Sequence, residues 1–353
     1  MKFPPPADPP GALRLHYNEN TAGCSPSVMA AIARLTPADI ATYPEYGQTL
    51  ERLGTWLGVP ASRVMLTNGL DEGLLIAAQY AAWHADGDAS ARTGGAAEFL
   101  IPEPAFEVFA DFSDLVRATI VRVMPRPDFA FPLDDVLAAI GPRTRAVYLI
   151  DPNNPTGLPL PEGAAERIAA AAPQALVFVD EAYADYSGRT LIGPALDRHP
   201  NLVVGRTFAK GHGLAGLRIG AVVAAEPMME RLRQLQPFFN VNVVAIRALE
   251  AALDDPAFLR QSVADAAESR ELVFAFCRRR GIEFWPGTGN FVLMRIGSQV
   301  ADVTKRLAAR GILARDKSAA PGCAGCLRVT TGVVAHTTQF LEALEEILAS
   351  RAN

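Results

Sequence analysis

VVGRTFAKGHGLAGLRIG (203–220) joins an apolar run, typical of a buried strand, to an isolated lysine. The chain has 33 basic residues, of which only Lys2, Lys210, Lys305 and Lys317 are lysine. An arginine stays protonated, whereas a lysine that loses its proton can attack a carbonyl group and form a Schiff base. Lys210 is therefore a candidate for chemistry that arginine does not perform, although a chance surface lysine would look the same without its neighbours.

The composition is typical of a globular enzyme. The chain has 353 residues, enough for one large domain and a smaller one; half are hydrophobic and a fifth are charged. The net charge is −5 and no basic run is present, which argues against a nucleic-acid-binding protein. We find no run that is apolar enough for a membrane span and no signal-peptide core in residues 1–20, so we expect a cytoplasmic protein.

The cysteines do not predict a metal site. Only Cys323 and Cys326, in CAGC, have metal-like spacing, and a structural zinc ion needs two further ligands nearby. Cys24 and Cys277 lie far away along the sequence, and the five histidines form no HExxH motif. We expect no metal and reduced, buried thiols.

From about residue 40, short apolar runs alternate with helical periods, which predicts an α/β fold. The runs are nearly continuous in apolar residues, as expected for a parallel sheet whose two faces are both covered. We predict seven strands at 63–66, 98–102, 119–124, 145–151, 175–180, 201–207 and 219–225. Helices are predicted at 73–83, 105–115, 133–140 and 161–172, and a surface loop at 85–95.

The pattern changes near residue 240. We predict a long helical stretch at about 242–280, strand-like runs at 290–296, 311–316 and 326–332, and a last helix at 338–350. This pattern is typical of a second, smaller α+β domain, and we expect residues 13–20 to belong to it. We therefore predict a large domain over 38–245 and a small domain made of 1–37 and 246–353.

Three of the predicted strands end in polar residues. The fourth ends at Asp151 and runs into PNNPTG (152–157), the fifth ends at Asp180, and the sixth leads to Lys210. Ligands of parallel sheets bind outside the carboxyl ends of the strands, so these groups and Arg218 would meet at one edge. Taken singly, each has a simpler explanation: a turn for PNNPTG, a helix cap for Asp180 and a surface charge for Arg218.

GHGLAG (211–216) matches the GxGxxG motif of dinucleotide-binding folds. That motif needs a helix that opens inside it and an acidic residue about 20 positions further on. Here the chain continues into another strand-like run, and residues 235–237 read LQP. We therefore reject a dinucleotide site.

An amine, a buried carboxylate, an amide and an arginine at one sheet edge suit a phosphorylated aldehyde on a pyridine ring. The amine forms the Schiff base, and the carboxylate keeps the ring nitrogen protonated so that the ring withdraws electrons. The arginine binds the phosphate. The ligand that combines these features is pyridoxal 5′-phosphate.

Four stretches carry a resemblance to a known family: DPNNPTG (151–157), VDEAY (179–183), TFAKGHGLAGLRIG (207–220) and CLRVTTG (326–332). From about residue 13 to its end, the sequence resembles the fold-type I, class I and II aminotransferases, and among them the histidinol-phosphate aminotransferases. The resemblance implies a large domain with a mostly parallel seven-stranded sheet between helices, and a smaller α+β domain.

The resemblance assigns the predicted catalytic residues. Lys210 would carry the cofactor and then shuttle the proton, and Asp180 would hold the pyridinium nitrogen. Tyr183 and Asn154 would hydrogen-bond to the phenolic oxygen of the ring.

The remaining cofactor contacts are also implied by the resemblance. Phe106 would stack on the ring, and Tyr43, in YPEYGQ, would reach the phosphate of the neighbouring subunit, which implies a homodimer. Backbone N–H groups at a helix N-terminus would face the phosphate in TNGLDEG (67–73). The predicted phosphate contacts are Gly69, Leu70, Asp71, Thr207 and Arg218.

On the substrate side, the resemblance places Arg328 on an α-carboxylate, Arg315 on the phosphate of histidinol phosphate and Asn18 in the substrate pocket. Histidinol phosphate has no α-carboxylate, whereas the co-substrate glutamate does. Two positions depart from the subfamily: Ala209 replaces a serine before the lysine, and Ala22 replaces a tyrosine of the pocket. The second departure could favour another donor.

The resemblance thus implies an aminotransferase that converts histidinol phosphate and 2-oxoglutarate to imidazole acetol phosphate and glutamate. One alternative is an aminotransferase for aromatic or other amino acids, and another is a decarboxylase of the threonine-phosphate type with the same cofactor. A transcription regulator with an aminotransferase-like domain needs a basic DNA-binding module ahead of it. Because the resemblance begins near residue 13, we expect no such module.

Overall fold

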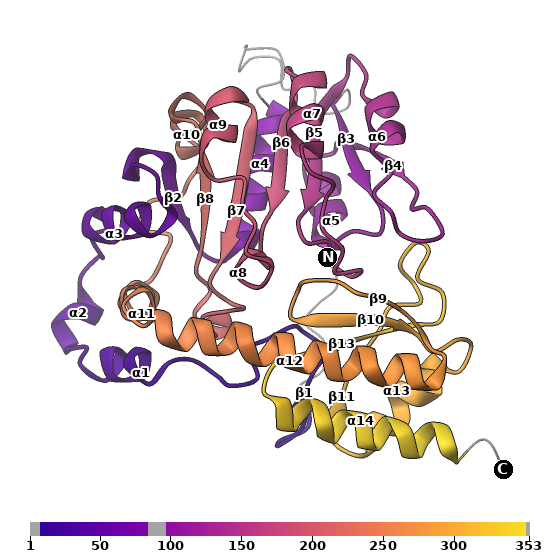
Figure 1. Ribbon diagram of the computed structural model, residues 1–353. Coiled ribbons are helices and arrows are strands. Elements are labelled where there is room, and N and C mark those ends of the chain that lie inside the picture. Colours follow the sequence, from indigo (N-terminus) through magenta and orange to yellow (C-terminus); the bar gives the residue numbers. More distant parts are fainter. Residues whose placement is uncertain (1–7, 84–96, 351–353) are drawn as a thin grey trace.

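A seven-stranded sheet organises the upper part of the computed structural model, which describes residues 8–83 and 97–350 (Figure 1). The strand order is β2-β8-β7-β6-β5-β3-β4; β8 runs antiparallel to both neighbours, and the other pairs are parallel. The strands are β2 (Val64–Thr67), β3 (Glu98–Pro102), β4 (Thr119–Val123), β5 (Thr144–Ile150), β6 (Leu176–Asp180), β7 (Leu202–Thr207) and β8 (Gly220–Ala224). All seven predicted strands are confirmed to within one residue at each end. The predicted loop at 85–95 lies outside the described residues.

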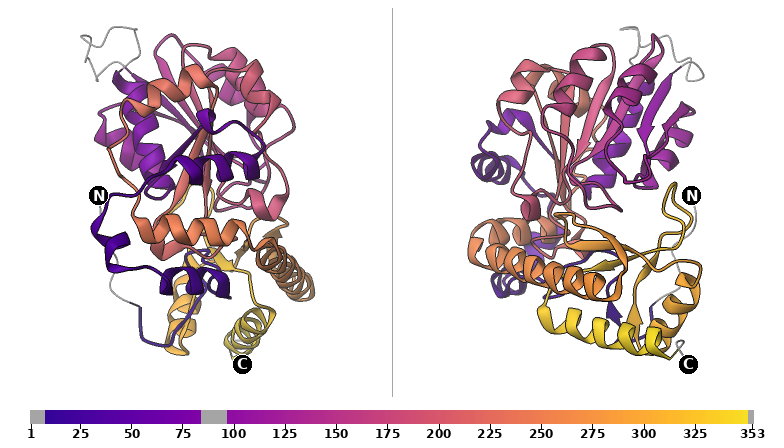
Figure 2. Two further views of the ribbon diagram at one scale, coloured as in Figure 1. Left: turned by 90° about the vertical axis from the view of Figure 1, so that its left-hand side faces the viewer. Right: turned by 45° about the vertical axis from the view of Figure 1, so that its right-hand side comes forward.

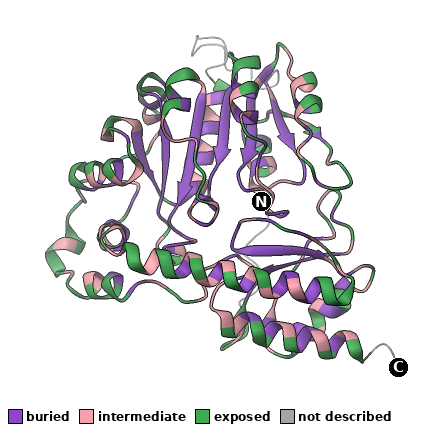
Figure 3. Cartoon of the chain, in the orientation of Figure 1, coloured by how far each residue is buried: buried purple, intermediate pink, exposed green. Residues whose placement is uncertain are grey.

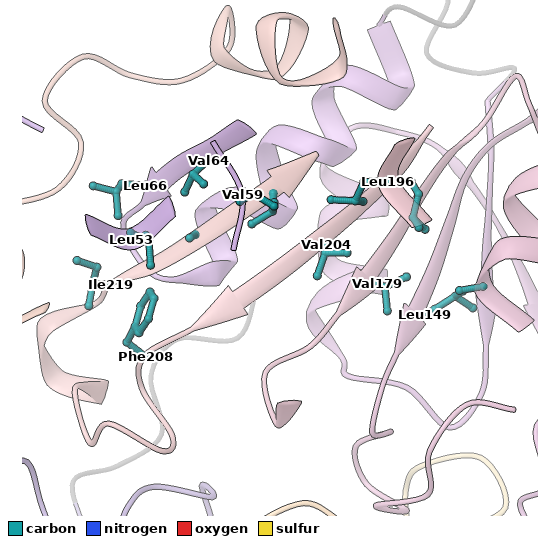
Figure 4. Close-up of a cluster of buried hydrophobic side chains, with 14 of the residues drawn as sticks. Leu53, Val59, Val64, Leu66, Leu149, Val179, Leu196, Val204, Phe208 and Ile219 are labelled. Carbon is teal, nitrogen blue, oxygen red and sulfur yellow. The ribbon is translucent and has the colours of Figure 1, made fainter. Parts of the chain in front are cut away.

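Helices cover both faces of this sheet, as the turned views show (Figure 2). In β5, Val147 and Leu149 belong to one hydrophobic cluster, whereas Tyr148 and Ile150 belong to the other. Part of the first cluster is drawn in Figure 4, and the burial colouring shows the strands of this sheet buried at their centres except for the edge strand β4 (Figure 3). Burial on both faces is the physical reason why the strands read as continuous apolar runs.

Each face has its own set of helices, and the four predicted ones correspond to α4 to α7. The first face is covered by α1 (Pro26–Ala33), α3 (Gly47–Leu57), α6 (Leu133–Ala139), α7 (Ala164–Ala171), α9 (Pro194–Arg198) and α11 (Val243–Leu253). The second is covered by α4 (Leu70–Trp83), α5 (Val108–Leu115) and α10 (Glu226–Arg233). The short elements α2 (Pro37–Ala41), η1 (Ala61–Arg63), α8 (Ala184–Ser187) and η2 (Ala215–Leu217) connect them.

The lower part has its own core. A four-stranded antiparallel sheet has the order β12-β13-β10-β9, and β1 pairs in parallel with β11 beside it. The strands are β1 (Leu13–Arg14), β9 (Glu283–Trp285), β10 (Phe291–Arg295), β11 (Ile312–Leu313), β12 (Arg315–Asp316) and β13 (Cys326–Thr330). The helices α12 (Pro256–Arg280), α13 (Val300–Ala309) and α14 (Val334–Ala349) pack on them. The two cores support the proposed two domains, whose boundaries at 38 and 245 stay a prediction.

The long helical stretch predicted at about 242–280 is confirmed, and it consists of two consecutive helices. α11 ends at Leu253, and Asp255 caps the next helix by accepting a hydrogen bond from the backbone N–H of Phe258 at 3.1 Å. Pro256 then occupies the first turn of α12. Aspartate as N-cap and proline in the first turn are start signals for a helix, so a new helix begins after DD (254–255).

The cysteines follow the burial expected of them. Cys277, Cys323 and Cys326 are buried, and Cys24 is partly buried, each as a free thiol. Among the described residues, no three metal-ligating side chains gather in one place. None of the helices in the described part of the chain has the length and apolar character needed to cross a bilayer.

Candidate active site

The carboxyl ends of the parallel strands converge on a cavity of about 420 Å³, which is lined by residues of both parts of the molecule. β5, β6 and β7 contribute Asn154, Asp180 and Lys210, whereas the lower part of the molecule contributes Arg315 and Arg328. All the predicted site residues except Gly69 and Tyr43 line it: Asn18, Leu70, Asp71, Phe106, Asn154, Asp180, Tyr183, Thr207, Lys210, Arg218, Arg315 and Arg328. These residues, which are distant in the sequence, therefore lie together at the carboxyl ends of the strands, as predicted.

Lys210 lies three residues beyond the end of β7, and its Nζ donates a hydrogen bond to the carbonyl oxygen of Tyr17 at 2.9 Å. Burial lowers the pKa of Lys210 to about 8, with a further contribution from the positive charge of Arg328. Both effects disfavour the ammonium form. The site thus holds an amine that is much easier to deprotonate than an ordinary lysine.

Asp180 ends β6 and is buried. Burial raises the pKa of its carboxyl to about 7, although the Oδ1 atom accepts a hydrogen bond from the backbone N–H of Ala182 at 2.9 Å. That bond shapes the local turn, and the same carboxyl lines the cavity. No cationic side chain of the described residues lies within ion-pair distance of Asp180, and the charge of Lys210 only partly offsets the effect of burial on its pKa.

The turn PNNPTG has both a structural and a site-facing role. Asn153 accepts hydrogen bonds from the backbone N–H and the hydroxyl of Thr156, at 3.2 and 2.9 Å, and so holds the turn. Asp151 accepts from the backbone N–H of Leu160 at 3.0 Å. This leaves Asn154 to face the cavity. The simpler explanation of the motif as a turn and the functional one are therefore compatible.

Tyr183 and Asn18 join the two parts of the molecule inside the cavity. The Nδ2 atom of Asn18 donates to the hydroxyl oxygen of Tyr183 at 2.9 Å. Burial raises the pKa of Tyr183 to about 12, so its hydroxyl stays protonated and can donate in turn. Phe106 follows β3 at the same edge and also lines the cavity.

The β2–α4 turn and Arg218 form the end of the cavity nearest the sheet. Gly69 has a φ of +72° and donates its N–H to the carbonyl oxygen of Arg218 at 2.9 Å. The guanidinium of Arg218 forms an ion pair with Asp71 at 2.8 Å, and Thr207 accepts a hydrogen bond from the N–H of Ala209 at 3.2 Å. This end combines a helix N-terminus, a hydroxyl and a guanidinium, which is a donor set suited to a phosphate.

Arg315 and Arg328 form a like-charged pair across two strands. They are directly opposite one another in the antiparallel β12–β13 ladder, and both line the cavity. Arg328 is 6% exposed and donates only to neutral acceptors, namely Asn154 Oδ1 at 2.5 Å and the carbonyl oxygen of His16 at 2.7 Å. Its buried Nε has no acceptor among the described residues. Like charges directly opposite each other on neighbouring strands are destabilising. An anion bound between the two guanidinium groups would relieve this repulsion, so we expect this wall of the cavity to bind one.

Several lining residues were not predicted. His16 and Tyr17 contribute carbonyl oxygens to Arg328 and Lys210, and this backbone role leaves no mark in the sequence. Glu107 and Lys317 also line the cavity and bond to each other at 2.5 Å. The scarcity of lysine that singled out Lys210 applies equally to Lys317, and that signal could have found it.

Tyr43 lies outside the cavity. Its side chain is 78% exposed and stacks on Phe239, with ring centroids 4.4 Å apart. Phe238 and Phe239 are also exposed. An exposed aromatic cluster of this kind is typical of surfaces that bind another protein.

The model of the family "Aminotransferase class I and II" matches residues 10–347. The chain belongs to this family. Its relatives include a histidinol-phosphate aminotransferase of Thiobacillus denitrificans, 37% identical over 96% of this chain and 86% of the relative. Another, of Cupriavidus pinatubonensis, is 36% identical over 97% of this chain and 89% of the relative.

Solved structures of aminotransferases share the fold. The histidinol-phosphate aminotransferase of Sinorhizobium meliloti, in complex with pyridoxal 5′-phosphate, has a TM-score of 0.82 at 25% identity and covers 96% of this chain and 91% of that one. The enzyme of Clostridium acetobutylicum has a TM-score of 0.84 at 18% identity, with 95% and 98% covered. The predicted fold class is confirmed. So are the predicted enzyme type, a transaminase that uses an amino donor and a 2-oxo acid, and its cofactor, pyridoxal 5′-phosphate.

Proposed function

We propose that this aminotransferase transfers the amino group of histidinol phosphate to 2-oxoglutarate. The observation that carries the proposal is the cross-strand pair of Arg315 and Arg328, two guanidinium groups on one cavity wall that form no ion pair with an acidic side chain of the described residues. Such a pair suits a dianionic phosphate at Arg315, and Arg328 suits the α-carboxylate of glutamate in the second half of the reaction. The names of the relatives in Thiobacillus denitrificans and Cupriavidus pinatubonensis support the same donor.

The residues of the cavity fit the cofactor. A buried carboxylate without an ion-pair partner among the described residues suits a protonated ring nitrogen, because an opposite charge favours the ionised form of Asp180. The donors of the β2–α4 turn, Thr207 and Arg218 suit its phosphate. When bound, pyridoxal 5′-phosphate supplies an aldehyde that accepts the amino group and a ring that withdraws electrons from the bond to be broken.

The side chains around the cavity divide the remaining work. We assign to Lys210 the covalent attachment, and to its Nζ the transfer of the proton from the reacting carbon of the donor. Its lowered pKa supports this role, since the neutral amine is the form that accepts a proton. Tyr183 and Asn154 would hold the phenolic oxygen, and Phe106 would cover one face of the ring.

We also propose a homodimer in which Tyr43 reaches the neighbouring subunit's cofactor phosphate. Its 78% exposure within one chain and its place in an exposed aromatic cluster support this role. A cytoplasmic location remains part of the proposal, in line with the absence of a membrane-crossing helix among the described residues.

A single-turnover assay of the holoenzyme tests the donor. Each member of a panel (histidinol phosphate, glutamate, phenylalanine and threonine phosphate) is mixed with the enzyme, and the loss of the visible absorbance of the bound cofactor is followed. We expect histidinol phosphate and glutamate to react with the highest kcat/KM. Faster reaction with phenylalanine would favour the aromatic alternative, for which the missing pocket aromatic at Ala22 is a reason. Release of CO₂ from threonine phosphate would favour the decarboxylase.

The Arg315→Ala variant tests the anion wall. We expect KM for histidinol phosphate to rise at least about tenfold, since one charge-assisted fork to the phosphate is lost, with a smaller change for glutamate. Arg167→Ala, an exposed arginine of α7 away from the cavity, is the matched control. Equal losses for both donors would mean that Arg315 serves the shared carboxylate or the fold, and the phosphate assignment would fail.

A further inference from the structure

Lys317 is a buried ammonium on the substrate side of the cavity. It follows β12, and its backbone N–H donates to the carbonyl oxygen of Cys326 at 2.9 Å, which continues the ladder with β13. Because side chains alternate along a strand, Lys317 is on the same face as Arg315. Its side chain is only 5% exposed. Three cations therefore share this wall, and Lys317 is buried there as Arg328 is, whereas Arg315 is exposed.

Glu107 covers that ammonium. Its Oε1 accepts from Lys317 Nζ at 2.5 Å, and its side chain is 60% exposed. Burial alone would raise the pKa of Glu107, but the charge and the hydrogen bond of Lys317, with Arg315, hold it below its ordinary value. The pair is thus asymmetric: a molecule that enters the cavity meets the carboxylate first, with the ammonium behind it.

Glu107 retains unused acceptor capacity. No other residue of 8–83 and 97–350 donates a hydrogen bond to its carboxylate, and an ionised carboxylate has lone pairs for about four. It lies one residue beyond Phe106, at the start of α5. Arg315 and Arg328 lie on the same substrate side and are suited to bind an anion. This end of the cavity therefore presents a cationic surface, formed by the arginines, and an anionic one, formed by Glu107.

We propose that Glu107 determines donor specificity by accepting a hydrogen bond from a ring N–H of the amino donor, and that Lys317 is the positioning residue that holds its carboxylate in place. The proposal rests on the proposed function, which it deepens: the donor carries an anion for the arginine pair and an N–H-bearing ring, such as imidazole, for Glu107. A carboxylate placed for such a ring rejects an isosteric phenyl group, because its desolvation is then uncompensated.

The test compares two donors that differ only in the ring. Histidinol phosphate and phenylalaninol phosphate share the amine and the phosphate, and single-turnover kcat/KM is measured for each with the holoenzyme. We expect the wild type to prefer the imidazole donor by roughly 10- to 100-fold, as for one hydrogen bond to a charged group. Glu107→Gln should bring this preference close to one through the KM of histidinol phosphate, with little change for the phenyl donor.

Two further variants separate the roles. Lys317→Met keeps the length of the stem and should reduce the preference less than Glu107→Gln, again through KM with kcat preserved. Glu162→Gln, an exposed glutamate outside the cavity, is the control and should leave the preference unchanged. An equal rise of KM for both esters in Lys317→Met would mean that Lys317 binds the phosphate itself, which overturns its assignment as a positioning residue.

A second donor pair separates this proposal from the proposed function. If neither ester reacts with the wild type, histidinol phosphate as donor is wrong, and histidine and phenylalanine give the same ring comparison without a phosphate. Loss of the preference for histidine in Glu107→Gln would then still support the role of Glu107. A ring preference that is unchanged by Glu107→Gln with the reacting pair would overturn it.

Discussion

At the residue scale, the cavity holds two groups whose charged forms are both disfavoured. Burial raises the pKa of Asp180 to about 7 and lowers that of Lys210 to about 8. Pairs of titratable groups with displaced pKa values are typical of active sites. In the cofactor-free protein, the burial of each of these groups therefore lowers the free energy of unfolding. A bound cofactor would offset this loss.

Lys210 can be tested by its covalent chemistry. Reduction of the holoenzyme with borohydride, followed by digestion, should give one cofactor-labelled peptide that contains Lys210, because only an unprotonated amine attacks an aldehyde. Lys210→Arg should lose both this label and the visible absorbance, since a guanidinium does not deprotonate. Lys305→Arg, an exposed site, should keep both. A label on any other lysine would rule out the assignment.

Asp180→Asn tests the cost of the buried carboxyl. A folded-state pKa of about 7 against an unfolded value of 3.8 means that the folded protein binds more protons between these pH values. Stability therefore falls as pH rises through this window and stays lower above it. We expect the cofactor-free variant to gain up to about 4 kcal/mol over the wild type at pH 8, and less than half of that at pH 5. Urea unfolding at both pH values measures the difference; a gain that does not depend on pH would refute the effect.

At the element scale, the β2–α4 turn has almost no room for a side chain. Gly69 has a φ of +72°, and a Cβ atom there would lie 2.5 Å from Arg218 Nη2. Gly220, at the start of β8, would bring its own Cβ within 2.7 Å of the backbone nitrogen of Leu70. The close approach of β8 to the helix N-terminus brings Arg218 to the predicted phosphate site.

Gly69→Ala should disturb both the turn and the anion site. We expect a loss of about 1–3 kcal/mol in unfolding free energy from the left-handed backbone alone, and a raised Kd for pyridoxal 5′-phosphate because Arg218 is displaced. Gly47→Ala is the control, because that glycine lies in the first turn of α3 with open space around it. Equilibrium dialysis and urea unfolding give the two values. An unchanged Kd would separate Arg218 from phosphate binding.

At the scale of the whole molecule, the proposed homodimer would make the sites of its two subunits depend on each other. The exposed cluster of Tyr43, Phe238 and Phe239 is the surface through which we expect the second copy to bind. Burial of exposed aromatic area drives such association. One chain supplies the cavity, and its neighbour would supply the Tyr43 hydroxyl.

Tyr43→Phe removes that hydroxyl and keeps the ring. We expect cofactor binding to weaken by about 1–2 kcal/mol, as for one charge-assisted hydrogen bond, with an unchanged dimer. Phe239→Asp should instead shift sedimentation toward the monomer and lower activity at low protein concentration, because it buries a charge in the interface. A wild type that sediments as a fully active monomer would contradict both expectations.

The sequence by itself determined the seven strands, most helices and the edge at which Asn154, Asp180 and Lys210 meet. These features follow from local apolar periodicity and from the rule that ligands bind at the carboxyl ends of parallel strands. The junction between α11 and α12 at DDP (254–256) also has a local signal in the sequence, a cap residue followed by proline. The helical pattern on both sides nevertheless predicts one continuous helical stretch. The roles of the site residues stay a prediction.

Only the tertiary structure decided which side chains meet across the cavity. Arg315 faces Arg328 because of the register between β12 and β13, and Lys317 reaches Glu107 across 210 residues of sequence. Register and packing between the two parts arise from non-local contacts, and these leave no periodic signal in either partner. The sequence thus predicted the chemistry of the cofactor side, where each group follows its own strand. The arrangement of charges on the substrate side is seen only in the tertiary structure, where the second sheet lies against the first.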